Sequence, residues 1–224
     1  MNETTPHADR LRTLVLVLTL INTIFAASLS GLQVDANIRA NNANRDSQYY
    51  ALLASNELVR LGHQGDYDLK LFADALKYAQ QSTVMELTAL ELEKNGNQES
   101  AAGLRSQSAI SKARSEKGLS LSILYSDPRY APKEADGLPD FAAYLADQSK
   151  GPNDLVAKQN AATDVYHKWN KKADAYVAVL TVLAIAFFLL GLAQSSVRMR
   201  LFFAISAVVV MSIAAVWTGY VTVS

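Results

Sequence analysis

Three long stretches of the chain contain no charged residue and are mainly apolar: residues 13–34, 175–197 and 201–224. An α-helix rises about 1.5 Å per residue, so each stretch is long enough to cross the ~30 Å hydrocarbon core of a bilayer. Only Arg198, Met199 and Arg200 separate the second stretch from the third. The pattern predicts an all-α integral membrane protein with three transmembrane helices, the last two forming a hairpin.

The first stretch allows two interpretations. A cleavable signal peptide would use the basic start at Arg10 and Arg12, the apolar run 14–27, and small residues at Ala26 and Ser28. A retained transmembrane helix would use all of residues 13–34. Apolar residues continue beyond the cleavage point that Ala26 and Ser28 would offer, which is more than a signal peptide needs and favours the retained helix.

Small and polar side chains recur at three- and four-residue spacing on two of the spans. On the first span they are Thr19, Asn22, Thr23, Ala26 and Ser30, and on the third Ala204, Ala207, Ala215 and Gly219. Such faces let membrane helices approach closely and form hydrogen bonds to one another. We therefore expect these faces to pack against other spans, although small residues are also common in membrane helices generally.

Charges near the spans predict an orientation. Arg10 and Arg12 precede the first span, and Arg198 and Arg200 lie between the other two. Because arginine is retained on the cytoplasmic side, residues 1–12 and the turn 198–200 should be cytoplasmic and residues 35–174 extracytoplasmic. The expected location is the inner cell membrane. Three lysines just before the second span, at 168, 171 and 172, oppose this orientation.

The segment between the spans has a helical period. Residues 35–61 continue the three- and four-residue spacing of apolar positions, so the first span should extend beyond the membrane. Gly62 and Gly65 are expected to end that helix, and residues 66–94 to form a second one. The turn 95–97 should follow, with Asn97 capping a third helix over 98–124.

The remainder before the second span is less regular. Residues 127–152 contain four of the five prolines, and a short helix is expected at 141–146. A last helix, capped by Asn153, should run from Asp154 to Ala193 and include the second span. Two stalks with two helices between them predict an extramembrane antiparallel four-helix bundle, spanning residues 35–174 and continuous with the spans.

Composition removes several classes of function. The 21 basic and 21 acidic residues balance, and no aromatic-rich basic cluster indicates nucleic-acid binding. No cysteine is present, so thiolate metal sites and cysteine nucleophiles are excluded.

Candidate chemistry is sparse. The three histidines are far apart, and no nucleotide-binding or hydrolase motif occurs. Glu134, Asp136 and Asp140 form an acidic loop, read either as a solvated loop or as a weak site for a divalent cation. We expect a non-enzymatic protein without a cofactor.

The segment Ser47-Gln48-Tyr49-Tyr50 lies in an alanine-rich helical stretch, which follows an N-terminal span and precedes a C-terminal hairpin of two spans. In these features the chain resembles a family of bacterial membrane proteins known only as a domain of unknown function. The resemblance implies a membrane-anchored helical domain and assigns no catalytic residue.

Two functions fit this pattern. The first is a membrane scaffold or accessory subunit whose partners are the lipid bilayer and other membrane proteins, or further copies of itself. The second is a small-molecule sensor that holds a ligand inside the bundle near Tyr49, Tyr50, Tyr67 and Tyr78.

Overall fold

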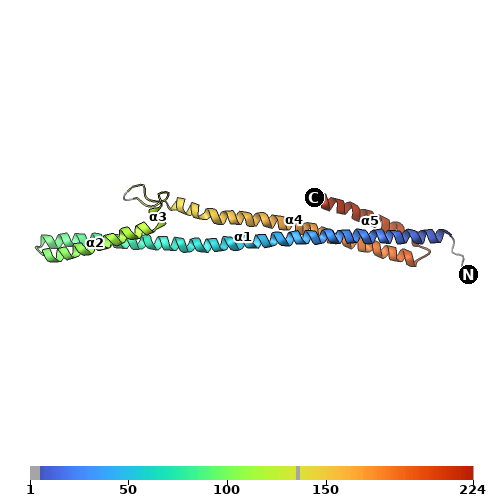
Figure 1. Ribbon diagram of the computed structural model, residues 1–224, viewed down its shortest axis with the longest axis horizontal. Helices are drawn as coiled ribbons and strands as arrows, with labels where there is room; N and C mark the ends of the chain where they lie inside the picture. The colour runs from blue at the N-terminus through green and yellow to red at the C-terminus, as the bar shows by residue number, and fades with distance from the viewer. Residues whose placement is uncertain (1–5, 135–136, 224) are drawn as a thin grey trace. The chain divides into compact units, whose positions relative to one another are not determined.

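The computed structural model describes residues 6–134 and 137–223, with side chains from Arg10 onward. The elements are α1 (Pro6–Lys94), α2 (Gln98–Leu121), α3 (Ile123–Ser126), α4 (Phe141–Ser195) and α5 (Arg200–Val223), as Figure 1 shows. No strand occurs among the described residues, which confirms the all-α class. The chain divides into two compact units. The terminal unit comprises residues 1–49 and 158–224, and the central unit residues 50–157.

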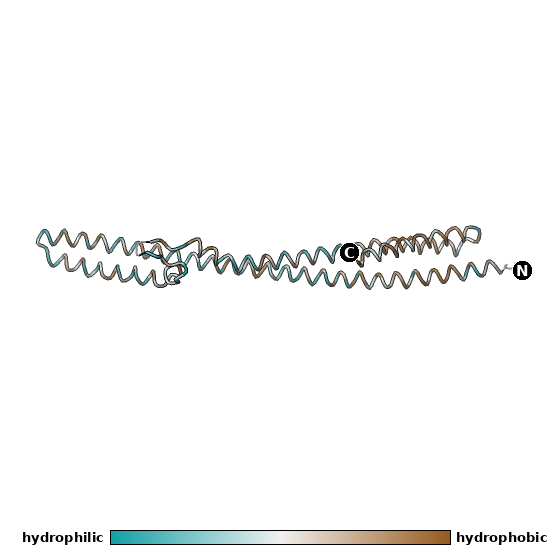
Figure 2. Tube along the Cα trace, turned by 90° about the horizontal axis from the view of Figure 1, so that it is seen from above, coloured by the Kyte–Doolittle hydropathy of each residue, from teal (hydrophilic) through white to brown (hydrophobic). Residues whose placement is uncertain are grey.

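Three helices, α1, α4 and α5, are long and apolar enough to cross a membrane. Brown, which marks hydrophobic residues in Figure 2, predominates in the N-terminal part of α1, the C-terminal part of α4 and α5. These are the three predicted spans. The prediction that the first span continues without a break into the next segment is also confirmed, since α1 is one helix of 89 residues.

A seven-residue repeat explains the continuity of α1. Two positions in each heptad are buried or half-buried from Val15 to Leu92, while most of the other positions are exposed. The first series of these inner positions is Val15, Asn22, Leu29, Ala36, Ala43, Tyr50, Glu57, Gln64, Leu71, Tyr78, Met85 and Leu92. The second is Thr19, Ala26, Gln33, Ala40, Ser47, Ala54, Leu61, Asp68, Ala75, Ser82 and Ala89. A repeat of this kind keeps one stripe of a helix facing its partners over a long distance.

The predicted helix end at Gly62 and Gly65 is wrong. Both glycines lie inside α1 and off the inner stripe, while Leu61, Gln64 and Asp68 maintain it. A glycine costs a helix only about 1 kcal/mol relative to alanine, which packing on both sides of it can offset. Because the helix does not turn there, residues 66–94 are not a separate helix, and the predicted four-helix bundle does not form.

The predicted break before Asn153 is also wrong. The short helix at 141–146 and the helix from Asp154 are one element, with Pro152 inside α4 and Asn153 not a cap. Proline removes a hydrogen bond and normally kinks a helix. Here α4 contacts α1 on both sides of the proline, through Tyr144 before it and Thr163 after it, and these contacts hold the two parts in one helix.

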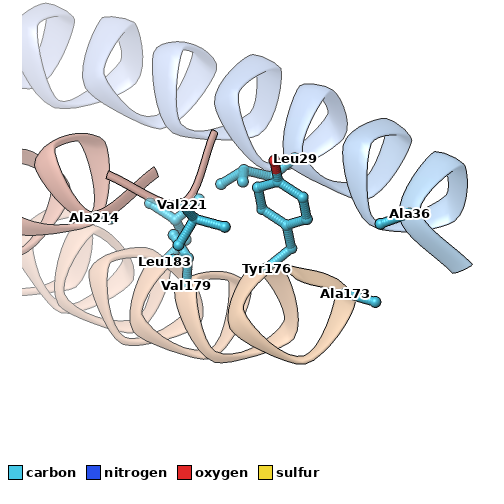
Figure 3. Packing of buried hydrophobic residues seen from close by; sticks show 8 residues of the cluster. All are labelled: Leu29, Ala36, Ala173, Tyr176, Val179, Leu183, Ala214 and Val221. Atoms are coloured by element: carbon cyan, nitrogen blue, oxygen red, sulfur yellow. The ribbon is translucent and has the colours of Figure 1, made fainter. Parts of the chain in front are cut away.

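In the terminal unit, α4 runs antiparallel to α1, and α5 antiparallel to α4. Leu29 and Ala36 of α1 form one cluster with Tyr176, Val179 and Leu183 of α4 and with α5 (Figure 3). Figure 3 shows the ring of Tyr176 directed toward Leu29. A second cluster joins Val15 to Leu190 and Ala204. The spans are therefore packed together chiefly by apolar contacts.

In the central unit, α2 lies antiparallel to the end of α1 along a seam of small residues. Ser115 Oγ donates to the Ala75 carbonyl at 2.8 Å, and the hydroxyls of Ser82 and Ser108 lie 2.8 Å apart. A Cβ added at Gly118 would lie 3.4 Å from Ala75 Cβ. Small side chains let the helices approach closely, so little apolar surface is buried between them.

The turn that joins α1 to α2 was correctly predicted. Gly96 has a φ of +81°, which favours glycine. Asn97 Oδ1 accepts a hydrogen bond from Ser100 N at 3.2 Å and caps α2. The helix that follows is shorter than predicted, since α2 ends at Leu121 and α3 begins after Ser122.

Candidate functional site

Asp68 joins the helices of the central unit to one another. It is the only acidic residue in the series of inner positions that contains it, and it is fully buried. Its Oδ1 accepts from Ile123 N at 2.9 Å, and its Oδ2 accepts from Tyr144 Oη at 2.9 Å and from Gln64 Nε2 at 3.2 Å. One carboxylate thus connects α1, the start of α3 and the first turn of α4. A buried carboxylate needs such donors to offset its lost hydration.

A second cluster surrounds Tyr130, which is buried against Tyr144 with ring centroids 5.4 Å apart. Tyr130 Oη donates to Asp147 Oδ2 at 2.7 Å, and Lys150 Nζ donates to Asp147 Oδ1 at 2.6 Å. The hydrogen bond from Lys150, together with that from Tyr130, lowers the pKa of Asp147. The hydrogen bond to Asp147 raises the pKa of Tyr130. These contacts fix the irregular segment before α4 onto that helix.

Burial and the Asp68 carboxylate both raise the pKa of Tyr144. Desolvation, with the hydrogen bond to Asp68 as the second cause, raises its pKa to about 12. Both favour the neutral phenol, because a phenolate would be poorly hydrated and would face a negative charge. Tyr144 therefore acts as a hydrogen-bond donor at physiological pH.

An apolar groove of about 390 Å³ lies next to this joint, between α1 and α4. The groove is lined on α1 by Leu58, Leu61, Gly62, Gly65, Asp66 and Leu69, and on α4 by Tyr144, Leu145, Gln148, Ser149, Pro152 and Asn153. A Cβ added at Gly62 or Gly65 would have no atom within 4 Å. The two glycines therefore leave space on α1 rather than ending the helix.

The predicted tyrosine pocket is not formed. Tyr49 and Tyr67 are exposed, and Tyr50 and Tyr78 are half-buried at separate points along α1. Tyr78 lies under the Arg114 guanidinium, which is 5.8 Å from its ring centroid. Tyr50 and Tyr78 belong to the same series of inner positions but are four heptads apart, about 42 Å along a helix, so the four tyrosines cannot enclose a common volume. The groove by Gly62 contains Tyr144 instead.

Carboxylates in and near the predicted acidic loop contact residues close to them in the sequence. Asp140 Oδ1 accepts from Ala143 N at 2.9 Å at the start of α4, and Asp127 pairs with Arg129 at 2.8 Å. Asp136 lies outside the described residues. Within 6–134 and 137–223, no group of three or more His, Asp or Glu side chains could hold a metal ion.

The predicted span-packing residues divide into three sets. Asn22, Ala204 and Ala207 are buried, and Asn22 Nδ2 donates to the Leu183 carbonyl at 3.3 Å. Thr19 and Ala26 are half-buried, and Gln194 Nε2 donates to Thr19 Oγ1 at 3.3 Å. Thr23, Ser30, Ala215 and Gly219 are exposed. The spans of one chain pack through the first two sets, and contact of the exposed set with another chain stays a prediction.

The arginines predicted to set the orientation lie at the ends of the spans. Arg198 is exposed, and Arg200 Nε donates to the Ala193 carbonyl at 3.1 Å, which caps the end of α4. Arg10 and Arg12 are exposed on α1. Asp68, Tyr130 and Tyr144 were not predicted as site residues. The signal for Asp68 was available, because it is an acidic residue in a heptad series otherwise made of small, apolar or neutral polar residues.

Comparison with known proteins adds no identification. No protein-family model matches the chain, and no curated protein or solved structure is significantly similar to it.

Proposed function

We propose that this chain is a non-enzymatic membrane scaffold or accessory subunit whose helices outside the spans bind another helical protein chain. The observation that carries the proposal is an outer leucine row on α1, formed by Leu58, Leu69, Leu76 and Leu90. Their side chains are 57%, 51%, 47% and 42% exposed. The spacing places them on one side of α1, next to the inner stripe.

Packing inside the chain leaves this row without a complete partner. The seam between α1 and α2 uses Ala75, Ser82, Ser108 and Ser115, so the large apolar side chains of the pair remain outside it. Full burial of a leucine side chain contributes about 1.5–3 kcal/mol of free energy. Each of these leucines is only partly buried and gains only part of that. An amphipathic helix laid along the row would bury the remainder.

Purification in mild detergent, with measurement of the mass of the protein component, tests the proposal. We expect the wild-type chain to be recovered with further copies or with another protein. The double substitution Leu69→Ser and Leu76→Ser should weaken that complex about tenfold, since burying the exposed half of each leucine side chain contributes about 1 kcal/mol. Lys70→Ser with Lys77→Ser is the matched control, at exposed neighbouring positions. A wild-type chain recovered alone as a monomer would contradict the proposal.

The groove beside Gly62 favours a second function, a sensor or binding module for a small apolar molecule. Its volume of about 390 Å³ lies within the ~300–1,000 Å³ usual for such sites. A thermal-shift screen of the full chain tests this, because a ligand at 100 times its dissociation constant adds about 2.7 kcal/mol. The substitution Gly62→Leu, which fills the groove, should abolish the shift. A shift that persists in this variant would locate the ligand elsewhere.

We also propose that the chain lies in the inner cell membrane with the first span retained and residues 35–174 extracytoplasmic. The two arginine pairs support this orientation through the positive-inside rule. Retention is supported by the buried contacts of Val15 and Asn22 with the other spans, which cleavage near Ala26 and Ser28 would remove. The intact mass of the protein isolated from membranes tests retention, and a product lacking residues 1–27 would overturn it.

A further inference from the structure

A cleft of about 540 Å³ in the terminal unit has a cationic wall and an aromatic wall. Lys168, Lys171 and Lys172 of α4 form the first wall, and Trp217 and Tyr220 near the end of α5 form the second. The charge-free stretch of α4 begins at Ala175, immediately after these lysines and Asp174. The cleft therefore lies where the spans meet the lipid–water boundary, which is the depth that Trp and Tyr favour.

The lysines are not neutralised by the protein. Among the described residues, none of the three forms an ion pair with a carboxylate within 4.0 Å. Asp164 is the one acidic residue lining the cleft, so its ionised side chains carry three positive charges against one negative charge. An uncompensated cluster of this kind attracts an anion.

Trp169 holds part of the cationic wall in position. The Arg39 guanidinium lies 4.7 Å from the centroid of the Trp169 ring, and Lys172 Nζ lies 5.4 Å from it. Arg39 in turn is bonded to Asp35 at 2.9 Å. Both cations are attracted to the ring. Lys172 is thus oriented by the ring, while Lys168 and Lys171 have no aromatic ring beside them in the part of the chain that the structure describes.

We propose that this cleft binds the phosphate group of an anionic lipid, with the lysines on the phosphate and with Trp217 and Tyr220 against the glycerol and upper acyl chain. Lysine binds phosphate as a point charge, and ring faces suit the apolar part next to it. An anionic membrane surface attracts each nearby lysine by about 1 kcal/mol, which is about a fivefold gain in affinity per lysine. With Asp164 offsetting one lysine, the net charge of two corresponds to about a twenty-five-fold preference over a zwitterionic lipid. The proposal also accounts for the three lysines on the side of the membrane opposite the arginine pairs.

Tryptophan fluorescence provides a direct test, because the chain has two tryptophans and one of them lines the cleft. The Trp169→Phe variant of the full chain, in nanodiscs of phosphatidylcholine, reports on Trp217 alone, and phenylalanine keeps an aromatic ring beside Lys172. We expect brominated phosphatidylglycerol to quench this emission at a mole fraction at least tenfold lower than brominated phosphatidylcholine. Adding Lys168→Gln, Lys171→Gln and Lys172→Gln should remove the difference.

The matched control is Lys70→Gln, Lys77→Gln and Lys112→Gln, which changes the charge equally in the central unit and should leave the preference intact. Equal quenching by the two lipids, or a preference that survives the triple substitution in the cleft, would overturn the proposal. Inorganic phosphate is added in a separate arm. Relief of quenching at millimolar phosphate would show a site for the free anion and would overturn the assignment to a lipid.

Discussion

Asp68 connects three helices through a single carboxylate, which accepts three hydrogen bonds. Ile123 N and Tyr144 Oη are both buried or partly buried at this point and use Asp68 as their acceptor. The charge is tolerated inside the protein because these donors surround it. The joint therefore depends on this one side chain more than on any apolar contact near it.

The substitution Asp68→Ala should lower the free energy of unfolding by about 2–4 kcal/mol, since it leaves two donors without an acceptor. Tyr144→Phe should cost only about 1 kcal/mol, because Asp68 keeps its bonds to Ile123 N and Gln64. Urea denaturation in detergent, followed by circular dichroism, measures both. Equal losses for the two variants would contradict the assigned role of the carboxylate.

Stability should also depend on pH through Tyr144. Its pKa in the folded protein is about 12, above the value near 10 of an unfolded tyrosine. Folding therefore favours the protonated phenol. This contribution is complete below pH ~10 and is lost as pH rises toward ~12, amounting to about 2–3 kcal/mol.

Unfolding measured at about pH 9 and pH 11.5 should show the loss, and Tyr144→Phe should reduce it. Titration of tyrosinate absorbance in the wild type minus that of the variant should give one group with a pKa near 12. A difference titrating near 10 would show that Tyr144 is not desolvated.

At the scale of the helix, α1 is held as one continuous element by the tertiary contacts of its inner stripe rather than by the propensity of each residue. Gly62 and Gly65 are unfavourable in a helix interior, yet packing on either side retains them. Their backbone is helical, and nothing lies within 4 Å of an added Cβ. The space they leave is the groove by α4.

Gly62→Ala and Gly65→Ala should therefore each stabilise the protein by about 0.5–1 kcal/mol, because alanine loses less backbone entropy in a helix. Thermal unfolding in detergent measures the change. Gly118→Leu provides the contrast, since a Cβ added at Gly118 would lie 3.4 Å from Ala75 Cβ and a larger side chain would separate α1 from α2. Destabilisation by Gly62→Ala would show that α1 bends at this glycine.

At the scale of the whole molecule, three apolar helices define the relation to the membrane, and the arginine pairs give the expected direction. The chain has no cysteine, so single cysteines can be introduced without a background. Ser106 of α2 and Val197 in the turn between α4 and α5 are both exposed positions for this purpose.

In cells with a permeable outer barrier, a membrane-impermeant maleimide should label Ser106→Cys at once. Val197→Cys should react only after the inner membrane is opened. Labelling of Val197→Cys alone in closed membranes would mean that the orientation is reversed. Labelling of both sites in closed membranes would mean that the hairpin does not span the bilayer.

The sequence by itself determined the features that depend on local chemistry. The three spans follow from the length of the charge-free segments, because lipid is the solvent around every residue of a span. The turn at Gly96 and the cap at Asn97 follow from backbone preferences that act over four residues.

Only the tertiary structure decided where the helices continue and which polar groups meet. Gly62, Gly65 and Pro152 are read locally as ends of helices, but contacts from distant residues outweigh their costs of about 1 kcal/mol for each glycine and about 3 kcal/mol for the proline. The joint at Asp68 brings together residues 68, 123 and 144. Because these residues are far apart in the sequence, the sequence alone does not show that they meet. The physical reason is that a glycine or proline changes the stability of a helix by only about 1–3 kcal/mol, and packing partners far away in sequence can reverse that.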